Sequence, residues 1–255
     1  MIRYQAQPPR ATLTIDDPVR SNPLSIEDME ALREGFRQAV GDPEVRVIVL
    51  TGAGERAFSA GGDLKAGFVD EPAAGHAGRG ALADLFRAMR RGGKPTVARV
   101  NGHALAGGFG LAAACDVVVA VKEARFGTPE VNVGLWPMMI TAVLQRCMPH
   151  KAALELMMTG RLITAHEARD LGLVTKVVPA QELDAAVDEV VETLAAKSAV
   201  TLRLGRDTFY RVQDLDFDEA LDVLQAGLTE VAMTEDAEEG VRAFLEKRPP
   251  QWRGR

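Results

Sequence analysis

Two loops of small residues carry the groups with the clearest chemical potential. In VIVLTGAGERAFSAGGDLK, Gly61 and Gly62 precede Asp63, and in ARVNGHALAGGFGLAAACD, Gly107 and Gly108 open a helical segment. Glycine allows the backbone to turn tightly and to approach a ligand closely. The first N–H groups of a helix have no acceptor within the helix. The two loops together therefore predict a pair of exposed amides that could bind an oxyanion.

Other interpretations of these loops are weaker. One glycine pair after a strand is usually a tight turn, but two such loops make a shared role more plausible. Neither loop contains a GxGxxG or G-K-[ST] nucleotide motif. Neither contains a G-x-S-x-G nucleophile elbow, although Ser59 lies nearby. No histidine is placed to make Cys115 a nucleophile, so we interpret Cys115 and Asp116 as structural.

The elements that must position these loops alternate along the chain. The β-type runs are TLTID at 12–16, VRVIVLTG at 45–52, TVARVNG at 96–102, DVVVAV at 116–121 and LVTKVVP at 173–179. A helix is predicted to begin at Ser25, where Ser25 and Asp28 form a capping pair, and another covers residues 81–91. Apolar strands that alternate with helices predict α/β layers with parallel pairing.

The last part of the chain has a different pattern. After about residue 180 the strand pattern stops and helical periodicity continues, which predicts an all-helical C-terminal region. The acidic segment DLDFDE at 214–219 is typical of a helix start, because acidic side chains favour the positive end of the helix dipole. We expect residues 66–80, rich in Gly, Ala and Pro, to resist a fixed conformation.

Composition restricts the possible partners. The 255 residues are 47% hydrophobic, which is enough for a substantial core, and the net charge of −6 argues against a nucleic-acid partner. Two cysteines and four scattered histidines show no disulfide framework and no metal-ligand spacing. The N-terminus lacks a secretory pattern, and the apolar stretch 109–121 is interrupted by Asp116. We expect a cytoplasmic protein with no metal and no membrane partner.

Several segments, in order and spacing, resemble the enoyl-CoA hydratase/isomerase (crotonase) family. They are AFSAGGDLK, NGHALAGGFGLAAACD, ARFGTPEVNVGLWP and LELMMTGRLITAHEARDLGLVTKVVP, and the terminal AFLEKRPP is also similar. The resemblance implies an α/β fold, a spiral of ββα units with a C-terminal all-helical region. It further implies a crotonase core at 1–195 and a helical trimerisation region at 196–255, assembled as a homotrimer or a dimer of trimers.

The resemblance also implies catalytic roles. Gly62 and Gly107 match the family's two amide donors to the thioester oxygen, and Glu130 in FGTPE matches its acid/base glutamate. Without the resemblance, Glu130 would be interpreted as a surface residue in a turn after Pro129. Two donors stabilise the negative charge that develops on the carbonyl oxygen, and losing one typically costs about 3 kcal/mol of barrier.

The implied acyl-CoA contacts are more widely spread. The resemblance assigns Arg20, Ala60, Asp63, Leu64, Met138, Phe244 and Lys247 to acyl-CoA binding. The last two would reach the nucleotide, sometimes from a neighbouring subunit. Exposed cations are more often solvated surface than ligand clamps. No separate cofactor is implied, because the coenzyme A thioester is itself the substrate.

One departure from the family leaves the reaction open. Hydratases of the best-known kind have a second glutamate where this chain has Gly110, so hydration by two carboxylates is in doubt. Met138, Met139 and Ile140 replace a glycine-rich stretch after Pro137 and could line the acyl end or simply pack in the core. We expect hydration of a 2-enoyl-CoA, with 3-enoyl to 2-enoyl isomerisation and a non-catalytic acyl-CoA or RNA-associated binding role as alternatives.

Overall fold

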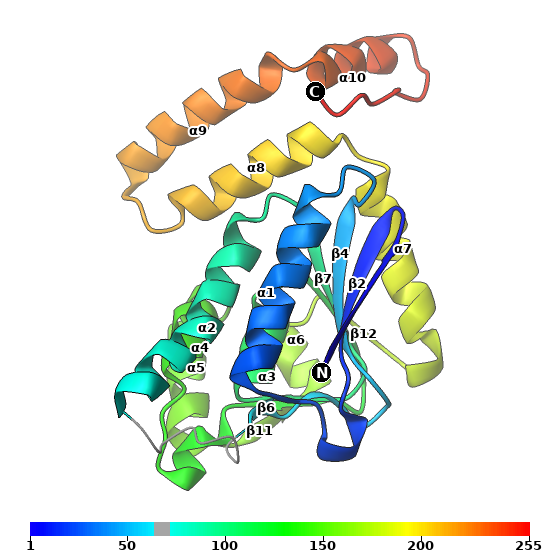
Figure 1. The fold of residues 1–255 in the computed structure, drawn as a ribbon. Coiled ribbons are helices and arrows are strands. Elements are labelled where there is room, and N and C mark those ends of the chain that lie inside the picture. Colours follow the sequence, from blue (N-terminus) through cyan, green and yellow to red (C-terminus); the bar gives the residue numbers. More distant parts are fainter. Residues whose placement is uncertain (64–71) are drawn as a thin grey trace.

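The computed structural model describes residues 1–63 and 72–255, and its largest sheet has six strands (Figure 1). In spatial order they are β1 (Ile2–Gln7), β2 (Arg10–Ile15), β4 (Val47–Gly52), β7 (Thr96–Val100), β9 (Val117–Val121) and β12 (Lys176–Val178). Strand β1 is antiparallel to β2, and the other neighbouring pairs are parallel. The five β-type runs of the sequence are thus strands, and the predicted parallel layering is confirmed.

Burial on both faces explains why these strands are apolar throughout. Every residue of β4 is buried. Helix α1 (Ile26–Gly41) packs on β1 and β2, and α7 (Leu183–Ala195) packs on β7 and β9. The two helices flank the sheet in Figure 1. The predicted start of α1 is correct, because the Ser25 and Asp28 side chains form a reciprocal capping box.

A second layer consists of short strands that follow the long ones. A four-stranded sheet has the order β11 (Leu162–Thr164), β10 (Arg125–Gly127), β8 (His103–Leu105) and β5 (Ala57–Ser59), and β3 (Pro23–Leu24) pairs with β6 (Gly61–Gly62). Strands β5, β8 and β10 directly follow β4, β7 and β9 along the chain and lie side by side in the same order. This repetition is the predicted spiral of ββα units.

Helices complete the repeats and form the C-terminal region. The remaining helices are η1 (Pro18–Arg20), α2 (Pro72–Arg91), α3 (Gly107–Ala113), η2 (Pro129–Val133), α4 (Met138–Cys147), α5 (His150–Thr159), α6 (Ala165–Asp170), η3 (Ala180–Glu182), α8 (Ala199–Val212), α9 (Phe217–Ala232) and α10 (Glu235–Leu245). From α7 onward the chain is helical, as predicted. Helices α8, α9 and α10 form a layer at one end of the molecule in Figure 1. The division at 195/196 and its trimerisation role stay predictions.

The start of helix α9 was predicted correctly, whereas the start of α2 was not. Helix α9 begins as predicted, with the Asp216 side chain accepting a hydrogen bond from Glu219 N. The expectation that residues 66–80 resist a fixed conformation is wrong for 72–80, which belong to α2. Pro72 is compatible with a first helical position, and the helix is held by its buried Leu85 and Met89. The remaining part of that prediction, 66–71, lies outside the described residues.

The Asp116 carboxylate links helix α8 to the core. Asp116, next to β9, accepts hydrogen bonds from Thr96 N at 2.7 Å, from Arg206 Nε at 2.8 Å and from the Tyr210 hydroxyl at 2.6 Å. Arg206, whose side chain is only 9% exposed, also donates to the Met89 carbonyl at the end of α2. Asp116 and Arg206 therefore join helix α8 to the sheet and to α2. Among the described residues, no helix has the length and apolar character needed to cross a membrane.

Replacing Asp116 with alanine is expected to lower the free energy of unfolding by about 3 kcal/mol, because Arg206 loses its partner in a mostly buried position. Chemical denaturation would measure the change. Asp214→Ala is the matched control, because Asp214 is 54% exposed and pairs with Arg146 at the surface. The control should lose less than about 1 kcal/mol. Equal losses in both variants would contradict the assigned role of Asp116.

Candidate active site

Three neighbouring parallel strands bring the candidate catalytic groups to one edge. Strands β5, β8 and β10 run parallel, with Ser59 beside Ala104 and Leu105 beside Gly127. Gly62 follows the end of β5, Gly107 follows β8, and Glu130 follows β10. Because parallel strands present their carboxyl ends at the same edge, these three groups share one side of the small sheet.

The two glycine loops touch each other at this edge. Gly61 has a positive φ of 92°, and a Cβ atom on it would lie 2.6 Å from the Ala106 Cβ and 3.0 Å from Gly107 N. A Cβ atom on Gly107 would lie 3.8 Å from Gly62 N. Gly107 is the first residue of α3, so its N–H has no acceptor within the helix. The predicted pair, Gly62 and Gly107, is therefore brought together by the fold.

The turn between β8 and α3 stores backbone strain. Ala106 has φ 49° and ψ −128°, a conformation that residues with a Cβ rarely adopt. Its N–H donates to the Gly127 carbonyl at 2.9 Å, which fixes the turn against β10. The strained residue thus immediately precedes the Gly107 amide and sets its direction.

Substituting Ala106 with glycine is expected to raise the free energy of unfolding by about 1 kcal/mol, because glycine adopts this backbone conformation without strain. Denaturant titration would measure the difference. Ala142→Gly is the control, because Ala142 is an exposed interior residue of α4. There glycine should instead lower stability by about 1 kcal/mol. A loss of stability at both positions would contradict the strained turn.

Glu130 lies in a partly buried position on η2. The chain leaves β10 through Thr128, whose buried hydroxyl donates to the Leu156 carbonyl at 3.1 Å. The Phe126 and Phe109 rings, 5.8 Å apart, join β10 to α3. The Glu130 Oε2 atom is buried and has no hydrogen-bond partner among the described residues. Burial raises the pKa of the Glu130 carboxyl above its ordinary value of 4.5.

This raised pKa has a consequence for stability. Ionisation of Glu130 costs free energy in the folded protein. The stability contributed by the neutral carboxyl is therefore fully present below pH 4.5 and is lost as the pH rises through the folded pKa. Glu130→Gln is uncharged throughout. The variant is therefore expected to unfold at higher denaturant concentration than the wild type at pH 7, and this advantage should disappear near pH 4.

Thermal and denaturant unfolding at both pH values would measure the effect. Glu123→Gln provides the control, because Glu123 is exposed and pairs with Lys122 at 3.7 Å. The control should change stability by less than about 0.5 kcal/mol. A gain in unfolding free energy from Glu130→Gln that is larger at pH 4 than at pH 7 would contradict the raised pKa of the Glu130 carboxyl.

Several predicted acyl-CoA contacts gather beside β6. Arg20 Nη1 lies 2.7 Å from Asp63 Oδ2, and the guanidinium also pairs with Asp17 at 2.7 Å. Ala60 N donates to the Ser21 carbonyl at 2.9 Å. The structure thus groups Arg20, Ala60 and Asp63 next to Gly62, with the Arg20 side chain 54% exposed. Leu64, predicted with them, lies outside the described residues.

The other predicted contacts are dispersed. Met138 is 67% exposed at the start of α4, and Phe244 is 82% exposed on α10. Lys247 follows α10 with a positive φ of 54°. Figure 1 places α10 at the opposite end of the molecule from β6, so one chain does not bring Phe244 and Lys247 to Arg20. Their predicted contact with acyl-CoA therefore requires a neighbouring copy, and it stays a prediction.

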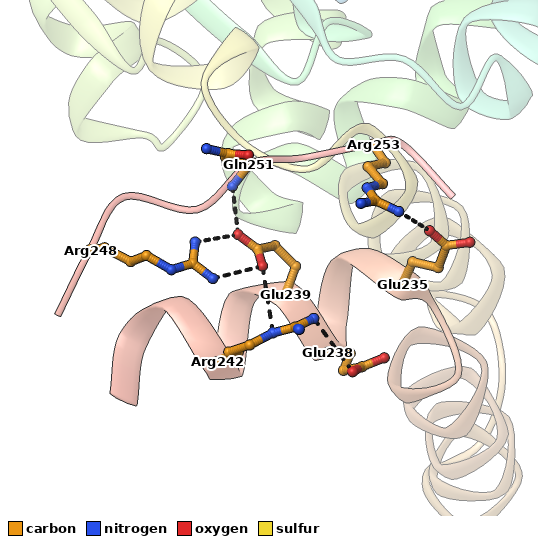
Figure 2. A pocket seen from close by; sticks show the side chains of 7 residues that line it. All are labelled: Glu235, Glu238, Glu239, Arg242, Arg248, Gln251 and Arg253. Atoms are coloured by element: carbon orange, nitrogen blue, oxygen red, sulfur yellow. Dashed lines mark hydrogen bonds and ion pairs between the residues drawn. The ribbon is translucent and has the colours of Figure 1, made fainter. Parts of the chain in front are cut away.

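A hollow beside α10 is lined mainly by charged side chains that neutralise one another (Figure 2). The lining residues are Glu235, Glu238, Glu239, Arg242, Arg248, Gln251 and Arg253. Glu239 pairs with Arg248 at 2.6 Å and accepts from Gln251 N at 2.9 Å. Hydrogen bonds from Arg248 lower the pKa of Glu239 to about 2. These groups anchor the C-terminal tail, and the hollow contains none of the candidate catalytic residues.

Two further observations concern metal and thiol chemistry. Within the ranges 1–63 and 72–255, no group of three or more His, Cys, Asp or Glu residues is arranged to hold a metal ion. Cys115 is buried, and burial raises the pKa of its thiol. A protonated thiol is a poor nucleophile, which agrees with the structural interpretation of this residue.

The sequence named Ile140 as a residue that could line the acyl end or pack in the core, but Phe86 was missed. Ile140 is 2% exposed on α4, and Phe86 is partly buried on α2. Both lie against Gly110, where a Cβ atom would be 2.2 Å from Ile140 Cγ2 and 3.0 Å from Phe86 Cζ. The bulky run after Pro137 signalled unusual packing, but nothing in the sequence paired it with Gly110. Phe86 gave no signal beyond helical periodicity.

Comparison with known proteins identifies the family. The family model described as enoyl-CoA hydratase/isomerase matches residues 10–255. A Thermus thermophilus protein provisionally named an enoyl-CoA hydratase is 39% identical over 95% of this chain and 96% of its own length. The carnitinyl-CoA dehydratase of Salmonella typhi is 34% identical over 97% of this chain and 96% of its own length.

Solved structures agree with the fold. The crystal structure of an enoyl-CoA hydratase from Mycobacterium smegmatis superposes with a TM-score of 0.94 at 35% identity, covering 98% of each chain. The chain therefore belongs to the enoyl-CoA hydratase/isomerase (crotonase) family. The predicted family and the predicted mixed α/β fold with a helical C-terminal region are both confirmed.

Proposed function

We propose that this crotonase-family enzyme hydrates a 2-enoyl-CoA to a 3-hydroxyacyl-CoA with a single acid/base residue, Glu130. The observation that carries the proposal is the buried, unpartnered Oε2 atom of Glu130 at the strand edge where the two glycine loops meet. The names of two relatives, an enoyl-CoA hydratase and a carnitinyl-CoA dehydratase, denote addition and removal of water. They support a reaction of this class.

The proposed mechanism uses backbone and side chain in turn. The Gly62 and Gly107 amides donate to the thioester oxygen and stabilise the enolate as negative charge develops there. Glu130 accepts a proton from water while the oxygen of that water adds to the β-carbon. The protonated carboxyl then returns a proton to the α-carbon. A raised pKa suits both transfers, because it brings the group nearer to the working pH. The CoA thioester is the substrate, and no separate cofactor enters these steps.

Isomerisation is the second candidate, and Glu130 alone would be sufficient for it. Glu130 would remove a proton from the α-carbon of a 3-enoyl-CoA and return it to the γ-carbon, with the same two amides holding the enolate. No water is consumed in this reaction, so one acid/base group is sufficient. The same observation, the buried and unpartnered Oε2 atom of Glu130, supports both reactions, and only the choice of substrate separates them.

The C-terminal helices support a proposed assembly. Helices α9 and α10 and the turn between them expose large apolar side chains, including Phe217 at 77%, Met233 at 82% and Phe244 at 82%. Exposed apolar surface of this kind is typical of a protein–protein interface. We propose a homotrimer or a dimer of trimers in which these side chains are covered. Such an assembly could bring Phe244 and Lys247 to a neighbour's acyl-CoA site.

Glu130→Gln is expected to lower the rate of the enzymatic reaction by about 10²- to 10⁴-fold, because the variant cannot exchange protons. Loss of ultraviolet absorbance from a 2-enoyl-CoA would report hydration, and gain of absorbance from a 3-enoyl-CoA would report isomerisation. Glu123→Gln, an exposed substitution, should leave the rate unchanged. A wild-type protein that binds acyl-CoA but converts neither substrate would contradict catalysis and favour the binding role.

A further inference from the structure

Gly110 on helix α3 packs against two apolar side chains, Ile140 and Phe86, which we call the apolar wall. A Cβ atom on Gly110 would lie 2.2 Å from Ile140 Cγ2 and 2.9 Å from Ile140 Cβ. It would also lie 3.0 Å from Phe86 Cζ. Distances below 3.0 Å are not compatible with a real side chain unless something moves. The space beside Gly110 is therefore already filled by side chains from α4 and α2.

This wall borders the candidate active site. Gly107 and Gly110 are three residues apart on α3, so they lie on the same face of the helix. A Cβ atom on Gly107 would contact Leu82 Cδ2 at 3.8 Å, and Leu82 lies four residues before Phe86 on α2. Helix α2 thus runs along this face, from the Gly107 amide to the wall. The wall begins one helical turn beyond the proposed oxyanion donor.

Ile140 cannot easily move aside. It is 2% exposed and belongs to the first turn of α4. Its branched Cβ strongly restricts χ1 in a helix, so the Cγ2 atom that blocks Gly110 has no alternative position nearby. Phe86 is only partly buried and offers the far end of its ring, which can shift more readily. Ile140 is therefore the dominant part of the barrier.

We propose that Ile140, assisted by Phe86, determines the specificity of this enzyme by closing the α3 side of the site to any second polar side chain. The proposal rests on the proposed function of Glu130. One wall of the reaction site is then hydrocarbon, and the acid/base group approaches from the η2 side only. The acyl groups that fit are apolar around the reacting carbons, and reactions that require two carboxylates are slow.

The test introduces a second carboxylate with and without the barrier. The variants are Gly110→Glu, Ile140→Gly and the double variant. Ile140 is changed to glycine because the Ile140 Cβ would lie only 2.9 Å from a Cβ atom at position 110. Melting temperature and the hydration rate of the four-carbon 2-enoyl-CoA, crotonyl-CoA, are measured for each. Gly205→Glu is the matched control, because Gly205 is also helical and a Cβ atom there would meet nothing within 4 Å.

Gly110→Glu alone is expected to lower the melting temperature by several degrees without a gain in rate, whereas Gly205→Glu should change neither measurement strongly. The double variant should melt at or above the temperature of Ile140→Gly and hydrate crotonyl-CoA at least 10-fold faster than Ile140→Gly. A stable Gly110→Glu variant with a full rate gain would overturn the proposal. A stable double variant that binds crotonyl-CoA but gains no rate would also overturn it.

Failure of the proposed function gives a different pattern. If Glu130 has no catalytic role, Glu130→Gln leaves every measured rate unchanged. In that case the specificity proposal is overturned together with the function. If Glu130→Gln abolishes the wild-type rate but the Gly110 and Ile140 variants do not interact in either melting temperature or rate, only the specificity proposal is overturned.

Discussion

The close approach of two backbone loops is the constraint on which the rest of the site depends. Gly61 and Ala106 come so near that a Cβ atom on Gly61 would be 2.6 Å from the Ala106 Cβ. This approach requires a residue without a Cβ atom at position 61, and the parallel pairing of β5 with β8 brings the two loops together. Hydrogen bonding in the small sheet thus supplies the energy that holds the amides of Gly62 and Gly107 near each other, and strain at Ala106 is the local cost.

The site also combines one acidic side chain, Glu130, with the apolar side chains of Ile140 and Phe86. Glu130, on η2 after strand β10, lies in a partly buried position that raises the pKa of its carboxyl. Next to α3, Ile140 and Phe86 fill the space beside Gly110. A proton-exchanging group with a buried, unpartnered oxygen is suited to chemistry at carbon, where water and extra charges would otherwise compete.

Much of this arrangement could be predicted from the sequence, because the relevant signals are local. The glycine loops, the Ser25 capping box and the helix start at Asp216 depend on a few neighbouring residues. The long strands carried continuous apolar runs. Short strands such as β5 and β8 have only three residues each and gave no periodic signal.

Features that depend on distant contacts could not be predicted in this way. The wall against Gly110 joins residues from α2, α3 and α4, and no local pattern relates them. The helix at 72–80 was missed because its Gly and Ala content is typical of a loop, while packing of the later turns stabilises it. The contact of Phe244 and Lys247 with acyl-CoA involves a part of the fold far from β6 and stays a prediction (Figure 1).

A crystal structure with a non-reactive acyl-CoA analogue would test the central claim most directly. The thioester oxygen should lie about 2.7 to 3.1 Å from both Gly62 N and Gly107 N, as expected for an oxyanion hole. The Glu130 carboxyl should lie beside the adjacent carbons, with Ile140 on the opposite side. A thioester oxygen bound away from these two amides, or a Glu130 carboxyl turned to bulk solvent in the complex, would contradict the proposed mechanism.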